Sequence, residues 1–171
     1  MIRTLRNLMR SAPAAALLIA ASIFQAHPAQ AATSYESDGC TSSGNTYCFA
    51  IYFNSVGSTT NSGQGACYIA NRSIPDHYGY SPNGATLVRL VFHYGMLPGG
   101  TCTTDSGDGD PLKNNAASMA NAECGVYDRV YFNSGYQGIS QAVYGTCGGY
   151  GGLAVNLVPD LKNENASHKR Y

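Results

Sequence analysis

The six cysteines carry the clearest chemistry in this sequence. No Cys-x-x-Cys pair occurs and no histidine stands at ligand spacing from a cysteine pair, which argues against zinc. An even cysteine count in an exported domain indicates disulfides instead. The sequence does not choose among the connectivities that six cysteines allow. We favour the pairing of neighbours, which keeps each bridge within one segment: Cys40–Cys48, Cys67–Cys102 and Cys124–Cys147.

Catalytic residues are sparse. After residue 31 the histidines are His77, His93 and His168, and neither H-E-x-x-H nor G-x-S-x-G occurs. Bridged cysteines would leave no thiol nucleophile. A pair of carboxylates acting on a glycoside stays open, because the acidic residues are not placed by the sequence. We do not predict an enzyme; a small disulfide-bonded exported domain is more often a binding protein or an inhibitor.

The first 31 residues have the features of a secretory signal peptide. Arg3, Arg6 and Arg10 precede an apolar run over 12–24, and Ala29-Gln30-Ala31 is a small-x-small cleavage site. The apolar run is too short for a membrane span. We therefore expect a secreted, extracellular protein with a single domain over 32–171. Three of ten basic residues and no acidic residue lie in the leader, so the mature net charge is −3. This charge favours neither a nucleic-acid nor a membrane partner.

Two phrases of the sequence each occur twice in the same order, which predicts a duplicated unit. A third, shorter match, Ile-Pro-Asp at 74–76 and Val-Pro-Asp at 158–160, subdivides each unit. We expect a first unit over about 45–118, with an insertion at 77–111, and a second over about 124–168. The insertion either carries the functional surface of the domain or adds an edge strand to a sheet. The repeated phrases are Ile51–Ser55 with Val130–Ser134, and Leu112–Ser118 with Leu161–Ser167.

Short β-type runs alternate with turn residues along the mature sequence, and this spacing favours an all-β sandwich or barrel. A turn of helix at 115–122 is the one helical element that we consider. The predicted strands cover 49–53, 67–70, 86–92, 126–132, 139–144 and 153–158.

The segment Tyr131–Gly138 has an aromatic residue, four residues, a second aromatic, one residue and glycine. It resembles the Greek-key hairpin signature of the βγ-crystallin superfamily, although the first unit has Gly57 at the second aromatic position. With Lys113–Ser118 and Lys162–His168, it resembles more narrowly the small secreted metalloproteinase inhibitors of actinobacteria, over about residues 112–168. The resemblance implies a βγ-crystallin-like Greek-key β-sandwich of two units. It also implies inhibition of a secreted, thermolysin-type metalloproteinase, and we expect a monomer.

In such inhibitors a rigid disulfide-held loop enters the protease cleft, with the reactive bond beside a bridged cysteine and a bulky apolar residue after it. Cys67-Tyr68 and Cys48-Phe49 fit this description, and Cys124-Gly125-Val126 fits it less well. We place the inhibitory loop at Cys67 and Tyr68, because the neighbouring Gly63-Gln64-Gly65 predicts an exposed turn. The alternative is that Tyr68 and Phe49 are strand residues that face the core.

The second repeated phrase also resembles the calcium motif of βγ-crystallins, which places Asn or Asp pairs before Ser. No motif in the sequence requires a cofactor, but calcium is one cofactor that the sequence leaves open. Met119 and His168 stand where the motif ends in Ser. The alternative is that these residues stabilise turns through side-chain-to-backbone bonds. The candidate ligands are Asn114, Asn115, Ser118, Asn163, Glu164 and Ser167.

The acidic segment Asp105–Asp110 is a second calcium candidate, or a solvated loop. The rival to inhibition is a non-inhibitory secreted crystallin-like module that binds calcium, or glycan of a cell wall or fungal surface. The tyrosine and asparagine content of the sequence suits contact with a glycan as well as contact with a protein.

Overall fold

The computed structural model describes residues 32–40, 47–97, 100–102, 104–148 and 154–171. These residues form strands and turns without a helix, so the all-β prediction is confirmed. Within the same residues, no helix has the length and apolar character needed to cross a membrane. The strands are β1 (Ala32–Glu36), β2 (Asp38–Gly39), β3 (Phe49–Asn54), β4 (Gln64–Ala70), β5 (Gly79–Tyr80), β6 (Thr86–Leu90), β7 (Gly95–Leu97), β8 (Gly100–Cys102), β9 (Ser118–Asn121), β10 (Tyr127–Asn133), β11 (Gln137–Tyr144), β12 (Val155–Asn156) and β13 (Ser167–Arg170).

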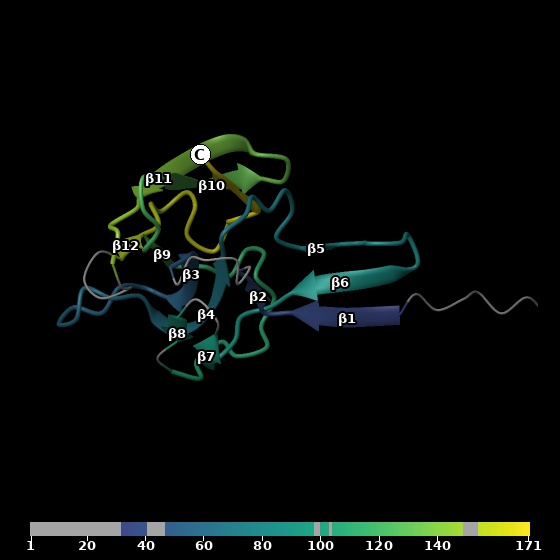
Figure 1. The fold of residues 1–171 in the computed structure, drawn as a ribbon, viewed down its shortest axis with the longest axis horizontal. Coiled ribbons are helices and arrows are strands. Elements are labelled where there is room, and N and C mark those ends of the chain that lie inside the picture. The colour runs from purple at the N-terminus through teal and green to yellow at the C-terminus, as the bar shows by residue number, and fades with distance from the viewer. Residues whose placement is uncertain (1–31, 41–46, 98–99, 103, 149–153) are drawn as a thin grey trace, which may run out of the picture. The chain divides into compact units, whose positions relative to one another are not determined.

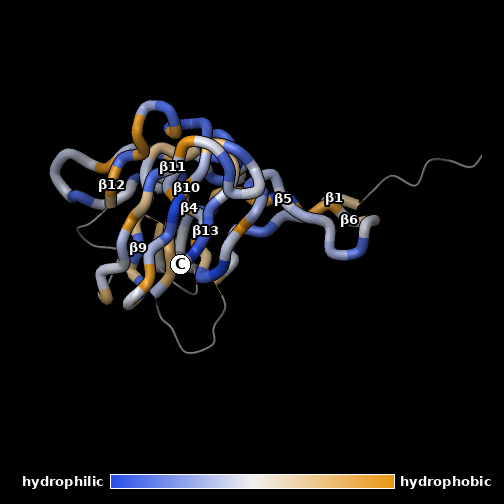
Figure 2. Tube along the Cα trace, turned by 90° about the horizontal axis from the view of Figure 1, so that it is seen from above, coloured by the Kyte–Doolittle hydropathy of each residue, from blue (hydrophilic) through white to orange (hydrophobic). Residues whose placement is uncertain are grey.

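The strands form four sheets, and the largest has the order β12-β9-β3-β4-β2. A three-stranded sheet, β11-β10-β13, lies beside it in Figure 1. A second three-stranded sheet, β1-β6-β5, extends beyond the other strands in both Figure 1 and Figure 2. The fourth sheet is the β7–β8 pair. Both of its strands come from the predicted insertion at 77–111, as do β5 and β6.

The five-stranded sheet is buried on both faces. Successive side chains of a strand point to opposite sides of the sheet, so each strand contributes to two separate clusters. In β3, Phe49 and Ile51 face the main hydrophobic core, which also contains Val130 of β10. Ala50 and Tyr52 face a second cluster around the Cys67–Cys102 disulfide. This two-sided burial explains the unbroken run of buried residues along β3 and β4.

Three disulfides join neighbouring cysteines, as the sequence suggested: Cys40–Cys48, Cys67–Cys102 and Cys124–Cys147. The second ties the end of β8 to β4, an interior strand of the five-stranded sheet. Each bridge restricts the unfolded chain more than the folded one, which favours the folded state.

The predicted turn of helix at 115–122 is wrong, because β9 occupies this segment and pairs with β3. Ala-Ala-Ser-Met-Ala has helical propensity, but pairing along a buried sheet overrides a propensity of this size. The predicted strand over 153–158 shrinks to two residues, Val155 and Asn156, and residue 153 lies outside the described residues.

The β3–β4 and β10–β11 hairpins share an irregularity at corresponding places. The register shifts between Tyr52 and Asn54 in the first hairpin and between Tyr131 and Asn133 in the second. These residues come from the phrases that recur in the sequence. The same phrase therefore forms the same β-bulge twice, although the loops that follow differ in length.

A chain of polar side chains crosses the core. The Arg72 carbonyl can only accept, so His168 donates from Nε2 across 3.1 Å and its Nδ1 accepts from His77 Nε2 at 2.9 Å. His77 Nδ1 then accepts from the Asn165 amide at 2.9 Å, and this amide also donates to the Leu112 carbonyl at 2.8 Å. Both rings are therefore neutral, with the proton on Nε2.

Burial holds both imidazoles in this neutral form. It lowers the pKa of His168 to about 3 and the pKa of His77 well below its usual 6.5, with the neighbouring ring adding to the second effect. The unfolded chain takes up protons near pH 6.5 that the folded chain excludes. Each ring therefore lowers the free energy of unfolding as the pH falls from 6.5 toward 3.

We predict that His77 and His168 keep one neutral tautomer down to about pH 5. Imidazole ¹H–¹⁵N spectra should show a protonated Nε2 and an unprotonated Nδ1 in both rings throughout that titration. A second proton, on Nδ1, would face the N–H group that already donates to that atom. Uptake of a proton by either ring in the folded chain above this pH would contradict this order of donors and acceptors.

Candidate functional site

The structure does not place Cys67 and Tyr68 in an exposed loop. Both lie within β4 and are 1% exposed, and Cys67 forms the disulfide with Cys102. The exposed turn predicted at the neighbouring Gly63-Gln64-Gly65 is also wrong, because Gly63 and Gly65 are buried. Cys48 and Phe49 are equally buried, at 0% and 1%. A protease could reach neither peptide bond unless the central strands separated.

The third cysteine-flanked segment, Cys124-Gly125-Val126, lies at the surface. Cys124 and Gly125 are exposed, and Gly125 has a φ of 71°, which allows the chain to reverse between β9 and β10. Cys124 is bridged to Cys147, which is also exposed. We refer to residues 123–126 as the Cys124 turn. It combines an exposed backbone with a covalent tether to the segment after β11.

Backbone hydrogen bonds fix the Cys124 turn on both sides of the disulfide. The Gly145 amide donates to the Val126 carbonyl at 2.9 Å, and the Cys147 amide donates to the Glu123 carbonyl at 3.3 Å. Gly145 lies so close beneath the turn that a Cβ there would be 2.1 Å from the Glu123 carbonyl oxygen. Only glycine fits this position without displacing the turn.

A buried charged cluster supports the turn from within the protein. The fully buried Glu123 carboxylate accepts from Arg170 Nε and Nη2, both at 2.8 Å. Asn121 accepts from the Glu123 amide at 2.9 Å and donates to Asp128 Oδ2 at 3.0 Å. Sequence reasoning did not single out these residues. The one available signal was that Asp128 shares the inward face of β10 with buried Val130.

Asp128 is a neutral acid at neutral pH. Burial, and to a smaller extent the charge of Glu123, raise its pKa to about 8, and Arg170 offsets part of the effect. The folded chain therefore holds a proton that the unfolded chain releases above 3.8. The free energy of unfolding falls as the pH rises from 3.8 through 8, opposite to the contribution of the buried histidines.

Tyrosine rings lie next to the turn. The rings of Tyr127 and Tyr171 are stacked, with centroids 4.8 Å apart and planes within 6°. Tyr144 packs against Tyr127 at 5.4 Å and is 71% exposed. Tyr127 directly follows Val126, so these aromatic rings lie beside the Cys124 turn. A protein bound at the turn would contact the rings as well.

The two asparagine-rich turns, proposed above as calcium ligands, bond to each other. The Asn114 amide donates to the Asn165 carbonyl at 2.9 Å, and the Asn163 amide donates to the Ala116 carbonyl at 2.8 Å. Asn114 and Asn163 have φ values of 62° and 60°, a left-handed conformation that Asn tolerates better than most residues. This geometry gives both residues a turn-forming role.

The serines of the same motif face inward. Ser118 and Ser167 are 0% exposed, and their hydroxyls donate to the carbonyls of Asn54 and Asn133 at 2.6 Å and 2.7 Å. They connect each turn to the bulge of its hairpin. Glu164, the one carboxylate in the motif, is exposed at the surface.

The two asparagine-rich turns border a polar cavity of about 280 Å³, and Lys162 lines it. Lys162 Nζ donates to the Ser55 hydroxyl at 2.8 Å, and at the corresponding place Lys113 Nζ donates to the Ser134 hydroxyl at 2.9 Å. An ammonium group opposes a divalent cation in the same cavity. Calcium binding here stays a prediction. The cavity is lined by Phe53, Asn54, Ser55, Asn115, Ala117, Lys162 and Asn163.

The acidic loop at 105–110 is attached to the strands beside it. Asp108 accepts from the Tyr94 amide at 2.8 Å and lies 3.6 Å from His93 Nδ1. The Ser106 carbonyl accepts from the Ala66 amide of β4 at 2.9 Å. Among the described residues, no group of three or more His, Cys, Asp or Glu side chains has the arrangement of a metal site.

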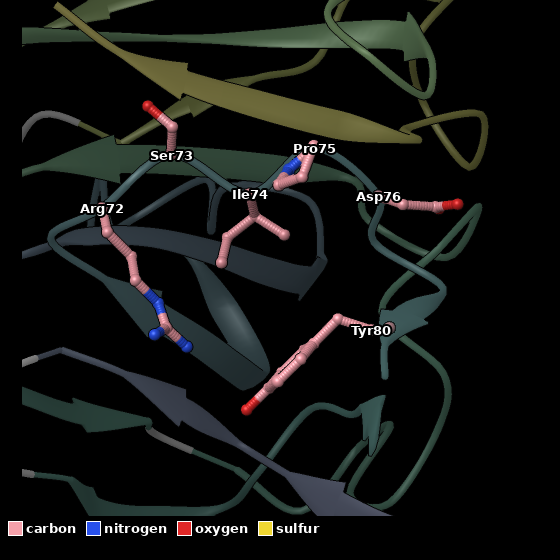
Figure 3. A pocket seen from close by; sticks show the side chains of 7 residues that line it. Arg72, Ser73, Ile74, Pro75, Asp76 and Tyr80 are labelled. Atoms are coloured by element: carbon pink, nitrogen blue, oxygen red, sulfur yellow. The ribbon is translucent and has the colours of Figure 1, made fainter. Parts of the chain in front are cut away.

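A small cavity of about 200 Å³ lies between Arg72 and Tyr80 (Figure 3). Ile74 points into the space between these two side chains, whereas Asp76 points away from it. Arg72 is ion-paired with Glu36 at 2.7 Å and Asp76 with Lys113 at 3.0 Å. The charged groups around this cavity are thus already partnered, and the Cys124 turn is the stronger candidate site.

No protein-family model, curated protein or solved structure matches this chain. The function must therefore be argued from the residues and their geometry.

We predict that Asp128→Asn stabilises the protein at alkaline pH. The amide keeps an acceptor for Asn121 and never acquires the buried charge, so its advantage over the unsubstituted chain should grow from about pH 5 to about pH 9. Thermal unfolding of both proteins across this range measures the difference.

Asp76→Asn is the matched control, because backbone and lysine hydrogen bonds lower the pKa of Asp76. That variant should lose stability at neutral and alkaline pH. A difference between Asp128→Asn and the unsubstituted chain that does not change with pH would show that Asp128 is not a buried neutral acid.

Proposed function

We propose that this chain is a secreted proteinaceous inhibitor of thermolysin-type metalloproteinases, and that the Cys124 turn is its inhibitory segment. The observation that carries the proposal is the exposure of this turn. Of the three cysteine-flanked segments that contain an apolar residue, Cys48-Phe49 and Cys67-Tyr68 lie in buried strands, whereas in the third Cys124 and Gly125 are exposed and Val126 is half-buried.

The bond between Gly125 and Val126 suits the proposed target class. Thermolysin-type proteases favour a bulky apolar residue after the scissile bond, and Val126 occupies that position. The Cys124–Cys147 disulfide connects the chain on the two sides of this bond. Hydrolysis would therefore leave both product ends attached to one another and still held in the cleft.

The surroundings of the turn favour tight binding through preorganisation. The disulfide, the two backbone hydrogen bonds and the Arg170–Glu123 ion pair hold the segment in one conformation before a protease is met. Little conformational entropy is then lost on association, and the affinity rises accordingly. The exposed ring of Tyr144 supplies neighbouring contact area.

We further propose that the fold is a βγ-crystallin-like pair of Greek keys. The two hairpins with matching bulges, β3–β4 and β10–β11, support it. So does an exchange between the units: β12, from the second unit, pairs with β9, which begins where the first unit ends. Reciprocally, Ile74 of the first unit bridges His168 of β13 in the second.

A second candidate is glycan binding, and one surface favours it. Tyr35, Tyr78 and Arg89 line a groove of about 500 Å³ on the β1-β6-β5 sheet. The Arg89 guanidinium covers one face of the Tyr78 ring at 3.6 Å from its centroid, and the 70% exposed ring of Tyr35 supplies an aromatic surface of the kind that sugar rings stack on. This surface is separate from the residues of the Cys124 turn.

We predict that the chain with intact disulfides inhibits thermolysin cleavage of a peptide substrate, and that Val126→Asp weakens inhibition by at least about tenfold. The charged side chain cannot enter an apolar specificity pocket without losing its hydration. Val126→Leu, which keeps an apolar side chain, should retain inhibition. The measurement is residual activity as a function of inhibitor concentration.

Val158→Asp is the control, because Val158 is 40% exposed and lies outside the turn; it should inhibit as the unsubstituted chain does. Absence of inhibition by the unsubstituted chain at micromolar concentration would reject the target class. Full inhibition by Val126→Asp would instead reject the Cys124 turn as the inhibitory segment.

A further inference from the structure

Arg89 is the one described arginine that neither donates a hydrogen bond nor forms an ion pair within the described part of the chain. Arg72 and Arg170 form ion pairs with glutamates. Arg129 donates to the Ser140 hydroxyl at 2.9 Å. The Nε atom of Arg89 is buried, and no described residue accepts from it. A buried donor without an acceptor opposes folding, so the presence of Arg89 calls for a reason other than stability.

The neighbours of Arg89 in the β1-β6-β5 sheet supply no carboxylate. The residue paired with it on β1 is Tyr35, and the residue paired with it on β5 is Gly79, where a side chain has no room. Glu36 points to the opposite face of β1, because side-chain direction alternates along a strand. On that face Glu36 pairs with Arg72 at 2.7 Å. The nearest acidic residue on β1 is therefore already engaged elsewhere.

Arg89 lines the groove of about 500 Å³ on this sheet and is the single charged residue among the described residues that line it. Leu87, Arg89 and Val91 are spaced two residues apart, so they share one face and span about 13 Å at about 3.3 Å per residue. Thr33 and Tyr35 follow the same spacing on β1. A groove that runs along the strands for this length suits a short stretch of an extended polymer.

The Tyr78 ring holds the Arg89 guanidinium in place. The guanidinium carbon lies 3.6 Å from the centroid of the ring, so the ring covers one face of the group. The N–H donors of a guanidinium lie in its plane, and stacking on a face leaves those at its edge free. Two parallel N–H groups at this edge match the two oxygens of a carboxylate.

We propose that this groove binds an acidic glycan, and that Arg89 holds the carboxylate of a uronic acid unit within it. The carboxylate accepts from two N–H groups of Arg89, and the 70% exposed ring of Tyr35, beside Arg89, stacks on a sugar ring. This assignment rests on the second candidate function, glycan binding, and gives the chemical class of the glycan. No residue of the Cys124 turn takes part in it.

The position of the groove favours a glycan over a peptide. The groove lies on the face of the sheet, and β6 pairs with β1 on one side and β5 on the other. An extended peptide gains affinity from backbone hydrogen bonds to a free strand edge, which a sheet face does not offer. A sugar ring can instead pack its apolar face on a tyrosine while its hydroxyl groups stay in water.

The charge of the groove favours isolated carboxylates over a dense polyanion. Arg89 supplies one positive charge, and the mature chain has a net charge of −3. A closely spaced row of sulfates or phosphates would require several cations and would be repelled by the rest of the protein. A uronic acid unit carries one carboxylate, which one guanidinium can hold.

NMR titration with two oligosaccharides that differ in one group tests the proposal. De-esterified oligogalacturonate carries free carboxylates, whereas its full methyl ester masks them on the same chain. The unsubstituted protein with intact disulfides should bind the acid at least about tenfold more tightly than the ester. Oligomannuronate and its methyl ester repeat the comparison with a different ring stereochemistry, and the preference should appear in at least one of the two pairs.

Arg89→Met is the decisive variant, because methionine can still cover the Tyr78 ring but donates no hydrogen bond. It should bind the acid at least about tenfold more weakly and should bind acid and ester alike. Tyr35→Ala should weaken acid and ester by the same factor, because stacking does not depend on the carboxylate. Arg129→Met is the matched control, since Arg129 lies on β10 outside the groove, and it should bind as the unsubstituted chain does.

Each failure has a separate meaning. Equal binding of acid and ester by the unsubstituted protein would overturn the acidic class and leave glycan binding in place. Binding of neither form of either oligosaccharide would overturn glycan binding and this assignment together. An acid preference that survives in Arg89→Met would show that the carboxylate lies elsewhere. Tighter binding of an oligoglutamate peptide or a heparin oligosaccharide than of either uronate would overturn the proposed ligand class.

Discussion

The side chain of Asn165 connects more of this structure than any other described side chain. Its amide nitrogen donates to the Leu112 carbonyl and to His77, and its oxygen accepts from the amides of Asn115 and Ala116 at 3.1 Å and 2.9 Å. It is 0% exposed, so water replaces none of these bonds. Each buried polar group left unpaired costs about 1–3 kcal/mol. Loss of this one side chain would therefore threaten a domain whose total stability is expected to be about 5–15 kcal/mol.

Asn165 acts where the two copies of the repeated phrase differ. Ala116 stands at the corresponding place in the first copy, and Met119 stands where the second copy has His168. Asn165 and His168 together build the polar chain through His77, which belongs to neither phrase. The shared residues make the hairpins and turns, whereas the unshared ones join the copies. A buried network of this kind favours one arrangement of the two halves, since every polar group is paired only when the halves meet in this way.

Much of the fold follows from the sequence, because its signals are local. Short runs of β-branched and aromatic residues between turn residues predict the strands β3, β10 and β11, and chain proximity predicts the pairing of neighbouring cysteines. The same reasoning fails at Cys67 and Tyr68 for a physical reason. Gly63 lies against the Tyr52 ring, where a Cβ would be 2.1 Å away, and Gly65 takes a φ of 87° at the bulge. These glycines mark close packing rather than an exposed turn.

The candidate site is harder to predict, because its parts are distant in the sequence and only the fold brings them together. The sequence indicates the Cys124–Cys147 bridge, but the turn at Cys124 also depends on Gly145 and Arg170, and the sequence signal for each of these two is ambiguous. An arginine near the C-terminus gives no indication that it pairs with a buried glutamate. The alternation of β10 could have indicated the burial of Asp128, which is the main cause of its raised pKa, but not the further contribution of Glu123 across the turn.

Native-state hydrogen exchange on the unsubstituted protein tests the central claim, that Asn165 locks the two turns together. Asn115 and Ala116 directly follow the turn at 113–114, and their amides donate to the buried Asn165 oxygen. We expect both to exchange only through global unfolding, with the same free energy as amides of the central strand β3. Exchange of these two amides through low-energy local opening, at the rate of an ordinary surface turn, would contradict this account.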